Sequence, residues 1–337
     1  MVGEHPAASA VKIYQKALGV KLMVENPAII DFPYDDEYII VQSPELQHNG
    51  SIIDLNNLPK VSFCIPTLNN EDTIEKCLSS IANQNYPNVE IIVVDGNSKD
   101  KTIEIAKKYT NKIFFDSGLL GSARQTGVEK ATGEIVALFD SDIIIPHKDW
   151  LRNAVECFNY DDRVSTIWPE NIAPPDGGPV VRLYFNHWKL VIEDRIKKRR
   201  GLYGGGNALF LRRAIEEIGG VSRSLHWGED FDWAQKLKDK GYKVVYIHDP
   251  LYHDTMPCLK VFAKKQFTGA KTFTKTGFQL MNLSPYEVFY EQVVLGVKGM
   301  FHGLIVERDL SWYLYPVFVS IRGIAYGYTY VVAMKSR

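Results

Sequence analysis

The chain has 337 residues, of which 45% are hydrophobic and 23% are charged, an ordinary globular composition with enough length for one large domain and additions. Its 39 Lys and Arg residues nearly balance its 40 Asp and Glu residues, so a formal net charge of -1 provides no global field for nucleic acid or an anionic membrane. We therefore expect no nucleic-acid partner, and any charged ligand must be recognised locally.

Residues 1–58 form a mixed N-terminal accessory segment that ends in the turn-rich stretch QHNGSIIDLNNLPK. From Val61 onward, short apolar strands alternate with amphipathic helices. The strands are VSFCI at 61–65, VEIIVV at 89–94, a short one around Ile113, and IVALF at 135–139; the helices follow Asp72, surround Ile103 and run from Ser122 to Lys130. This alternation predicts an α/β fold with a mostly parallel sheet covered by helices on both faces.

Polar clusters follow the strands of this predicted sheet, in the order PTLNN, DGNSKD and DSD. Ligands of such sheets bind beyond the carboxyl ends of the strands. In DSD, the side chains of Asp140 and Asp142 face one site if the backbone stays extended, because Ser141 between them then points away. Two carboxylates side by side repel each other, and a divalent metal ion removes that cost. We therefore expect Mn²⁺ or Mg²⁺ here.

The ordered set of motifs between about Pro59 and Gly269 resembles the family 2 glycosyltransferases, which are inverting nucleotide-sugar transferases with the GT-A fold. The motifs are VSFCIPTLNNEDTIEKCLSSI, VEIIVVDGNSKD, GSARQTGVEKATGEIVALFDSD, GGGNALFLRR and WGEDFDWAQKLKDKGYKVVY. Each motif is unremarkable alone, whereas their order and spacing are specific.

The resemblance implies a set of residues for the nucleotide-sugar donor. The backbone after the first strand and Glu71 would contact the nucleoside, Asp95 the base and Asp140 the ribose, while Arg124 would face the nucleotide. A capping role for Asp95 and a surface charge for Arg124 are the structural alternatives. The four glycines of GLYGGG let the backbone approach a sugar closely. The donor-binding set is Pro66, Glu71, Asp95, Arg124, Asp140 and Gly205.

The resemblance also implies a metal site and a catalytic base. Asp142 would ligate the metal that bridges the donor diphosphate, with His253 as a further ligand and His248 as its competitor for that role. An inverting transfer needs a carboxylate that takes the proton of the acceptor hydroxyl. Asp230 is the predicted base and Glu229 the residue that positions it or the acceptor.

The region after the base departs from the processive members of the family. They carry a QxxRW signature, whereas this chain reads AKKQFTGAK, with Gln266 but no Arg-Trp, so we expect one sugar per event. Further on, Trp312 to Met334 is 23 residues long with Arg322 as its one charge, close to the about 20 apolar residues of a membrane span. A bilayer-spanning helix, a helix lying in the membrane interface and a helix packed on the domain all remain open.

We predict three parts: the accessory segment 1–58, a GT-A domain at 59–258, and a helical C-terminal region at 259–337 that associates with a membrane. The predicted activity is metal-dependent, inverting transfer of one sugar from a UDP- or GDP-linked donor to a hydroxyl of a lipid-linked or surface glycan. A polyprenyl-phosphate sugar synthase and a degenerate membrane-bound scaffold are the alternatives. Scattered cysteines and the lack of a secretory signal favour the cytoplasmic side of the cell membrane.

Overall fold

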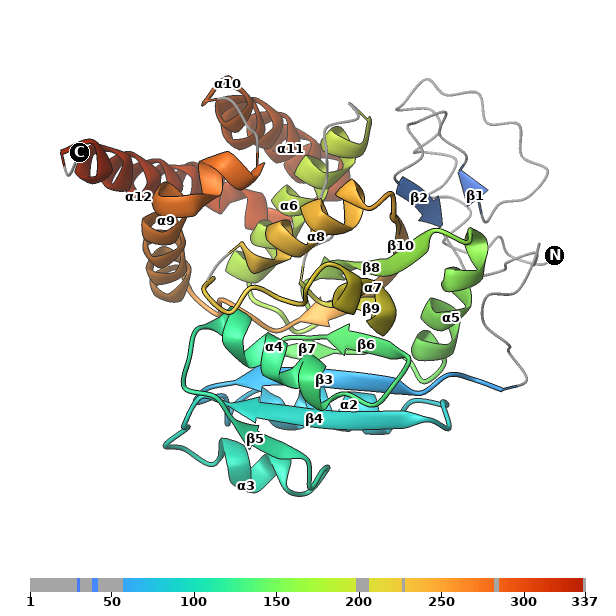
Figure 1. The fold of residues 1–337 in the computed structure, drawn as a ribbon. Coiled ribbons are helices and arrows are strands. Elements are labelled where there is room, and N and C mark those ends of the chain that lie inside the picture. The colour runs from blue at the N-terminus through green and yellow to red at the C-terminus, as the bar shows by residue number, and fades with distance from the viewer. Residues whose placement is uncertain are drawn as a thin grey trace.

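The computed structural model describes residues 29–30, 38–41, 57–197, 206–225, 228–281 and 285–335. A single sheet runs through the molecule (Figure 1). Its strands, in spatial order, are β1 (Ile29–Ile30), β2 (Tyr38–Val41), β10 (Lys243–His253), β8 (Val164–Ile172), β9 (Ala208–Leu211), β6 (Ile135–Leu138), β3 (Val61–Thr67), β4 (Val89–Asp95) and β5 (Ile113–Phe115), and β7 (Ile143–Ile144) pairs with β10.

The sheet consists of two parallel groups joined by one reversed strand. β6, β3, β4 and β5 are parallel neighbours, as are β8, β10 and β2. β9 lies antiparallel between β6 and β8, and β1 and β7 are also antiparallel to their partners. The predicted α/β sheet is confirmed, although β9 makes it mixed. β1 and β2 come from the predicted accessory segment 1–58 and extend the sheet, while the domain boundary at residue 58 stays a prediction.

The helices of the sheet region are α2 (Ile74–Ala82), α3 (Thr102–Ala106), α4 (Leu120–Lys130), α5 (Trp150–Glu156) with the 3₁₀ turn η1 (Cys157–Tyr160), α7 (Arg212–Glu217) and α8 (Glu229–Asp239). The predicted strands and helices between residues 61 and 139 are all present, with ends that differ by a few residues. Hydrophobic periodicity was therefore sufficient to locate them.

The two faces of β3 pack against different helices because successive side chains of a strand point to opposite sides. Cys64 faces α4, where a Cβ added to Gly127 would lie 2.8 Å from the Cys64 Cβ, so a glycine is needed for this close approach. Phe63 points the other way and makes an edge-on contact with Phe139, which in turn contacts Trp150 of α5. The predicted helical cover on both faces is confirmed.

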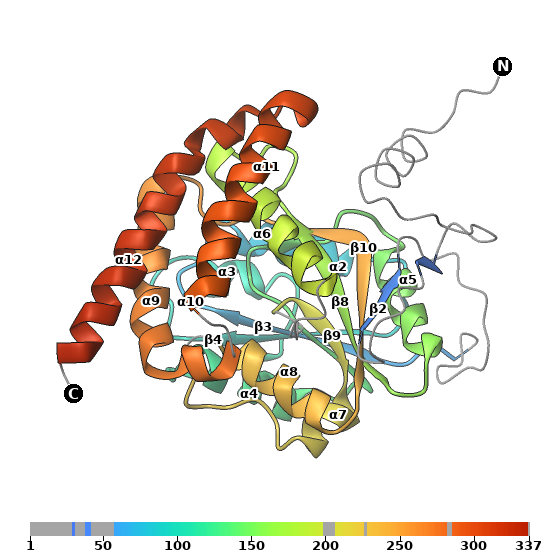
Figure 2. The ribbon, with the colours of Figure 1, turned by 90° about the horizontal axis from the view of Figure 1, so that it is seen from above.

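The C-terminal region is helical, as predicted, and packs on α6 (Pro179–Lys197). It comprises α9 (Leu259–Met281), α10 (Pro285–Phe289), the π-helical turn η2 (Tyr290–Leu295), α11 (Gly296–His302), the π-helical turn η3 (Gly303–Glu307), the 3₁₀ turn η4 (Leu310–Leu314) and α12 (Tyr315–Lys335). Seen from above, α12 runs beside α9, with α11 and α6 next to them (Figure 2). Leu183 of α6, Phe262 of α9 and Phe318 of α12 form a second hydrophobic core there.

Of the three possibilities for residues 312–334, packing on the domain is present in the structure, and contact of the outer side with a membrane interface stays a prediction. Trp312, Tyr315 and Phe318 are almost fully buried against α6 and its neighbours. A Cβ on Gly303 would lie 2.0 Å from the Trp312 ring, so this turn is shaped to receive the indole. None of the helices in the described residues combines the length and apolarity needed to cross a membrane.

Candidate functional site

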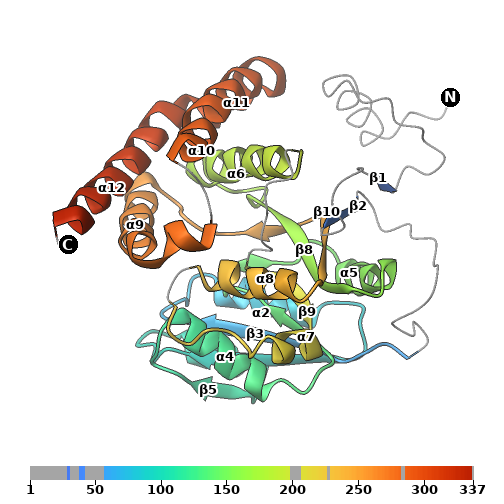
Figure 3. The same ribbon diagram turned by 45° about the horizontal axis from the view of Figure 1, so that its top comes forward.

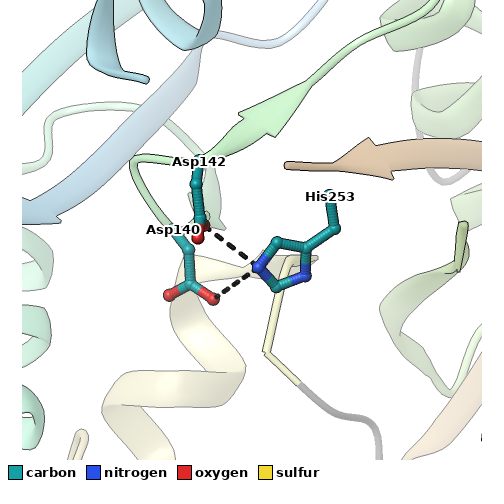
Figure 4. Close-up of side chains that lie close together, drawn as sticks. All are labelled: Asp140, Asp142 and His253. Atoms are coloured by element: carbon teal, nitrogen blue, oxygen red, sulfur yellow. Dashed lines mark ion pairs between the residues drawn. The ribbon is translucent and has the colours of Figure 1, made fainter. Parts of the chain in front are cut away.

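Asp140, Asp142 and His253 meet at the carboxyl end of the sheet, on three neighbouring segments (Figure 4). Asp140 lies just past β6, Asp142 just before β7, and His253 is the last residue of β10. The antiparallel pairing of β7 with β10 places Ile143 opposite His253, which brings the preceding carboxylate to the imidazole. His253 Nε2 lies 3.0 Å from Asp142 Oδ1 and 4.0 Å from Asp140 Oδ2.

The electrostatics of this cluster favour the charged form of each of its two closest members. Burial by itself would lower the pKa of His253, but the charge and hydrogen bond of Asp142 outweigh it and raise that pKa. Burial would likewise raise the pKa of Asp142, yet the neighbouring His253 holds it below its ordinary value. A cation between the two aspartates is therefore stabilised, and protonated His253 is one such cation.

The donor atoms fit a divalent metal ion. One ligand atom from each of Asp140, Asp142 and His253 lies within 4.8 Å of the other two, and all three residues are partly exposed. Carboxylate oxygen suits Mg²⁺ and Mn²⁺, and imidazole nitrogen is a common additional ligand of transition metals. His248, the competing histidine, instead contacts Glu170, with 3.1 Å between Nδ1 and Oε2. Asp140, Asp142 and His253 would hold the metal, and their role as ligands stays a prediction.

Arg124 connects this cluster to a second group of acids. It projects from α4 and is only 3% exposed. Its Nη2 donates to Asp140 Oδ1 at 2.7 Å, its Nε lies 3.2 Å from Glu229 Oε1, and its guanidinium stands 5.5 Å from the centre of the Trp233 ring. The alternative of a solvated surface charge is therefore wrong for Arg124, although its nucleotide contact stays a prediction.

Asn207 is a site residue that the sequence interpretation missed. Its side-chain oxygen accepts from the Asp140 backbone N–H at 2.7 Å, and its amide lies 3.3 Å from Asp140 Oδ2. Asn207 has a φ of 67°, in the left-handed region that asparagine tolerates better than most residues. The asparagine of GGGNALF was the available signal, but the neighbouring glycines were the residues assigned to the sugar. Together with Arg124, it fixes the orientation of Asp140.

The predicted base and its neighbour begin α8. Gly228, at a φ of 83°, provides the left-handed turn that admits the chain into this helix, and Trp233 and Leu237 anchor its buried face. Burial raises the pKa of Glu229 to about 7, with Asp230 adding to the effect and Arg124 opposing it. Burial also raises the pKa of Asp230, again against Arg124. Two acids with elevated pKa values, linked through Arg124 to the candidate metal-binding residues, are a typical functional arrangement.

The loops after β3 and β4 are bound to each other. Asp95 is fully buried, and its two carboxylate oxygens accept from the backbone N–H and the hydroxyl of Ser98, at 2.8 and 2.5 Å. Asn69, at a φ of 52°, donates its backbone N–H to the Ser98 hydroxyl. The geometry thus gives Asp95 the local turn-stabilising contacts of the structural alternative, and its contact with a base stays a prediction.

The other predicted donor residues occupy the same edge or lie outside the described residues. Pro66 is buried in β3, opposite Val94 of β4. Glu71 is exposed on the loop after β3 and accepts from the Lys101 backbone N–H at 3.0 Å. Gly205 falls in the part of the chain that is not described. The roles of all three stay predictions.

Helices α6 and α9 add side chains that the sequence interpretation did not assign. The Phe185 ring of α6 lies 5.4 Å from the His253 ring, and Tyr184 beside it contacts Phe318 of α12. Lys265 of α9 donates to the Thr255 hydroxyl, and its charge reaches Asp142 and His253. Helices α6 and α9 therefore border the cluster of Asp140, Asp142 and His253. In the sequence, α6 lies between the family motifs and α9 begins after the last of them.

Comparison with known proteins gives a consistent answer. The family model described as Glycosyl transferase family 2 matches residues 62–219. Glycosyltransferase AglE of Haloferax volcanii is 31% identical over 227 residues, which cover 64% of this chain and 73% of that protein. A dolichyl N-acetyl-alpha-D-glucosaminyl phosphate 3-beta-D-2,3-diacetamido-2,3-dideoxy-beta-D-glucuronosyltransferase of Methanococcus voltae is 33% identical over 108 residues, but these span only a third of its length, 33%.

A solved structure shares the fold. The mannosyltransferase PcManGT from Pyrobaculum calidifontis, in complex with GDP-Man and Mn²⁺, superimposes with a TM-score of 0.57 at 18% identity. The match covers 89% of this chain and 91% of that one. The predicted nucleotide-sugar transferase fold is confirmed.

Replacing the buried arginine tests how far the two acid groups depend on it. Arg124→Gln leaves Asp140 and Glu229 without their cation, and breaking a buried ion pair costs about 3–5 kcal/mol. We expect a loss of that order in the free energy of unfolding in urea. The double variant Arg124→Gln/Glu229→Gln should recover part of it, because a neutral amide needs no cation. Strictly additive losses would contradict the coupling.

Proposed function

The chain belongs to glycosyl transferase family 2, and on that premise we propose that it transfers one sugar, with inversion, from a nucleotide-diphosphate donor to a hydroxyl group of a lipid-linked or surface glycan. Membership of this family makes it an enzyme that transfers sugars. The observation that carries the finer proposal is the position of Asp140, which belongs to the metal cluster and is also bonded to Arg124, the cation that contacts Glu229 beside Asp230.

The donor half of the site is the cluster of Asp140, Asp142 and His253. These residues would hold Mn²⁺ or Mg²⁺, and the ion would neutralise charge that grows on the departing diphosphate. Arg124 and Asn207 hold Asp140 in one orientation, in which its Oδ2 lies 4.0 Å from His253 Nε2. The structurally similar mannosyltransferase binds GDP-Man with Mn²⁺, and we keep both UDP and GDP as candidate nucleotides.

The acceptor half is Asp230 at the start of α8. In a single in-line displacement, the acceptor hydroxyl loses its proton on the face opposite the leaving group, and an ionised carboxylate there takes it. The first turn of a helix favours that negative charge. Glu229, paired with Arg124, keeps the turn in place. Asp232 pairs instead with Lys236 at 2.6 Å and is not required.

We further propose that the enzyme works on the cytoplasmic face of a membrane, through its C-terminal helices. Large apolar side chains that are more than half exposed gather on α11, η3, η4 and α12. They are Phe301, Ile305, Val306, Leu310, Tyr313, Ile324 and Tyr328. Exposed aromatic and aliphatic side chains of this kind can insert into the membrane interface, where the enzyme would reach a lipid-linked acceptor.

The donor site predicts metal-dependent nucleotide binding. At a nucleotide concentration about 100 times Kd, UDP or GDP with Mn²⁺ should stabilise the protein by about 2.7 kcal/mol, seen as a higher melting temperature. Asp142→Asn should abolish this protection, whereas the exposed control Asp176→Asn should keep it. Protection of wild-type protein by neither nucleotide would support the degenerate scaffold instead.

The acceptor base predicts a selective loss of turnover. Asp230→Asn should slow sugar transfer from the identified donor to a lipid extract by about 10²–10⁴-fold, while Asp232→Asn should have little effect. Inversion is checked by NMR of the anomeric proton in the product. If Asp230→Asn retains most of its turnover, the acceptor is a phosphate, as in a polyprenyl-phosphate sugar synthase.

The same base sets the pH dependence. Asp230 must be ionised to accept a proton, and its folded pKa is raised by burial. Activity should therefore fall as the pH drops through a value above the about 3.9 of an ordinary aspartate. A kcat/KM profile that stays flat down to that ordinary value would contradict this role for Asp230.

Membrane contact predicts binding to vesicles. Phe301→Ser should weaken co-sedimentation with phosphatidylcholine–phosphatidylglycerol vesicles roughly tenfold, since burying a phenylalanine contributes about 1.5–3 kcal/mol. Phe115→Ser is the matched control, because Phe115 is also more than half exposed but is the last residue of β5, in the sheet region. Equal losses in both variants, or no vesicle binding by wild-type protein, would contradict the proposed surface.

A further inference from the structure

Arg322, the charge in the middle of α12, is held at the junction of four elements. Its Nη1 donates to Gln292 Oε1 of η2 at 2.7 Å and to His187 Nδ1 of α6 at 3.2 Å. Its Nε donates to Gln266 Oε1 of α9 at 3.2 Å. Figure 3 shows α6, α9 and α12 converging on this side of the sheet. Three neutral acceptors thus fix the position and plane of the guanidinium.

Aromatic rings complete the surroundings of Arg322. The guanidinium lies 4.5 Å from the centre of the Phe318 ring, 5.6 Å from Tyr184 and 5.8 Å from Phe262. Contacts of this kind stabilise a cation only weakly and leave its charge in place. The rings form an apolar wall around a charge that stays partly accessible.

No carboxylate among the described residues forms an ion pair with Arg322. Among the described residues, Arg124 and Arg195 are buried more deeply than Arg322, and carboxylates compensate both: Asp140 and Glu229 for Arg124, and Glu291 through two 2.7 Å bonds for Arg195. His187 offers no negative charge either. Its Nε2 donates to the Glu291 carbonyl, and burial together with Arg322 lowers its pKa to about 3, so it is neutral.

Arg322 lies next to the proposed active site, with two adjacent side chains of α6 between them. Phe185 contacts His253 of the metal cluster, and Tyr184 contacts Arg322. Burial raises the pKa of Tyr184; the charge of Arg322 opposes this rise and the charge of Asp230 adds to it. Tyr184 is therefore within electrostatic reach of both groups. A group bound at Arg322 would therefore lie beside Tyr184, near the proposed base Asp230.

We propose that Arg322 binds a phosphate group of the acceptor, so that the acceptor is a glycosyl phosphate whose sugar hydroxyl faces Asp230. This inference rests on the proposed function and adds the acceptor class to it. Nη2 of Arg322 takes no part in its three hydrogen bonds, and the two N–H groups of Nη2 can donate to phosphate oxygens beside the fixed charge. Gln292 lies in a π-helical turn, a distortion that often marks functional sites. The phosphate belongs either to a lipid-linked sugar or to a soluble sugar phosphate.

The test neutralises Arg322 without removing its contacts. Gln292→Glu places a carboxylate where the amide now accepts, so the folded state keeps its bond and gains an ion pair. We expect an unchanged or higher melting temperature and at least tenfold weaker binding of inorganic phosphate and of farnesyl phosphate, titrated in EDTA to exclude the metal cluster. Arg182→Gln, an exposed arginine of α6, is the matched control and should bind both probes like wild-type protein.

Each outcome decides the proposal. Tighter binding of farnesyl phosphate than of inorganic phosphate identifies a lipid-linked source, and equal binding a soluble one. Wild-type protein that binds neither probe, or Gln292→Glu that binds them as tightly as wild type, overturns the phosphate site. Arg322→Lys, which keeps the charge but loses the fork, should bind the probes with intermediate affinity; affinity equal to wild type would show that the guanidinium geometry is irrelevant.

Failure of the proposed function would look different. Mn²⁺-dependent protection by UDP or GDP is measured on the same proteins and should be equal in wild type and Gln292→Glu. Phosphate binding without nucleotide binding would leave the anion site standing and remove the transferase proposal. Nucleotide binding without phosphate binding would do the reverse.

Discussion

The buried guanidinium of Arg124 is the interaction on which the site depends. A charge that is 3% exposed can persist only with ionic partners, and here these partners come from distant parts of the chain. Asp140 follows β6 and Glu229 starts α8, nearly 90 residues later. Because the cation must be satisfied by both, the end of one strand and the start of one helix are held together. The metal cluster and the acid pair are thus parts of one electrostatic unit.

The sheet topology explains why such a unit forms at this edge. β9 is antiparallel between two parallel groups, so the chain approaches it from the edge at which β6 ends. Asn207 stands just before β9 and donates its backbone N–H to the Leu138 carbonyl, while its side chain bonds to Asp140. β7 then pairs with β10 and brings His253 to Asp142. Strand pairing therefore assembles residues that are more than 100 positions apart.

The C-terminal helices combine two properties that are usually separate. Their inner side chains form a core with α6, and Gly303 gives way to Trp312 where they turn. Their outer side chains remain apolar and exposed. Arg322 lies between these layers, where burial lowers its pKa. Its charge is stabilised there by neutral hydrogen-bond acceptors and aromatic rings. The position is costly for a structural arginine and well suited to an anionic ligand.

The amino-acid sequence determined the local elements and the chemistry of the main site. Apolar runs located the strands from Val61 to Phe139, and the acid motifs placed Asp140, Asp142 and Asp230 at the ends of regular elements, because periodicity and end signals are local properties. The ordered motifs were enough to indicate the family. The same sequence did not distinguish His253 from His248 as the metal ligand. It also left a spanning, an interfacial and a packed helix possible for residues 312–334.

Only the tertiary structure showed where these residues lie, because each position depends on which segments meet in space. His253 faces Asp142 through the β7–β10 pairing, whereas His248 contacts Glu170. Arg322 is the one charge in an otherwise uncharged stretch of sequence, and its hydrogen-bond acceptors come from α6, α9 and η2. The motif GGGNALF contained Asn207 but did not indicate its partner, since that bond goes to a residue 67 positions away. Side-chain partners at long range are set by packing, and packing is not local in the sequence.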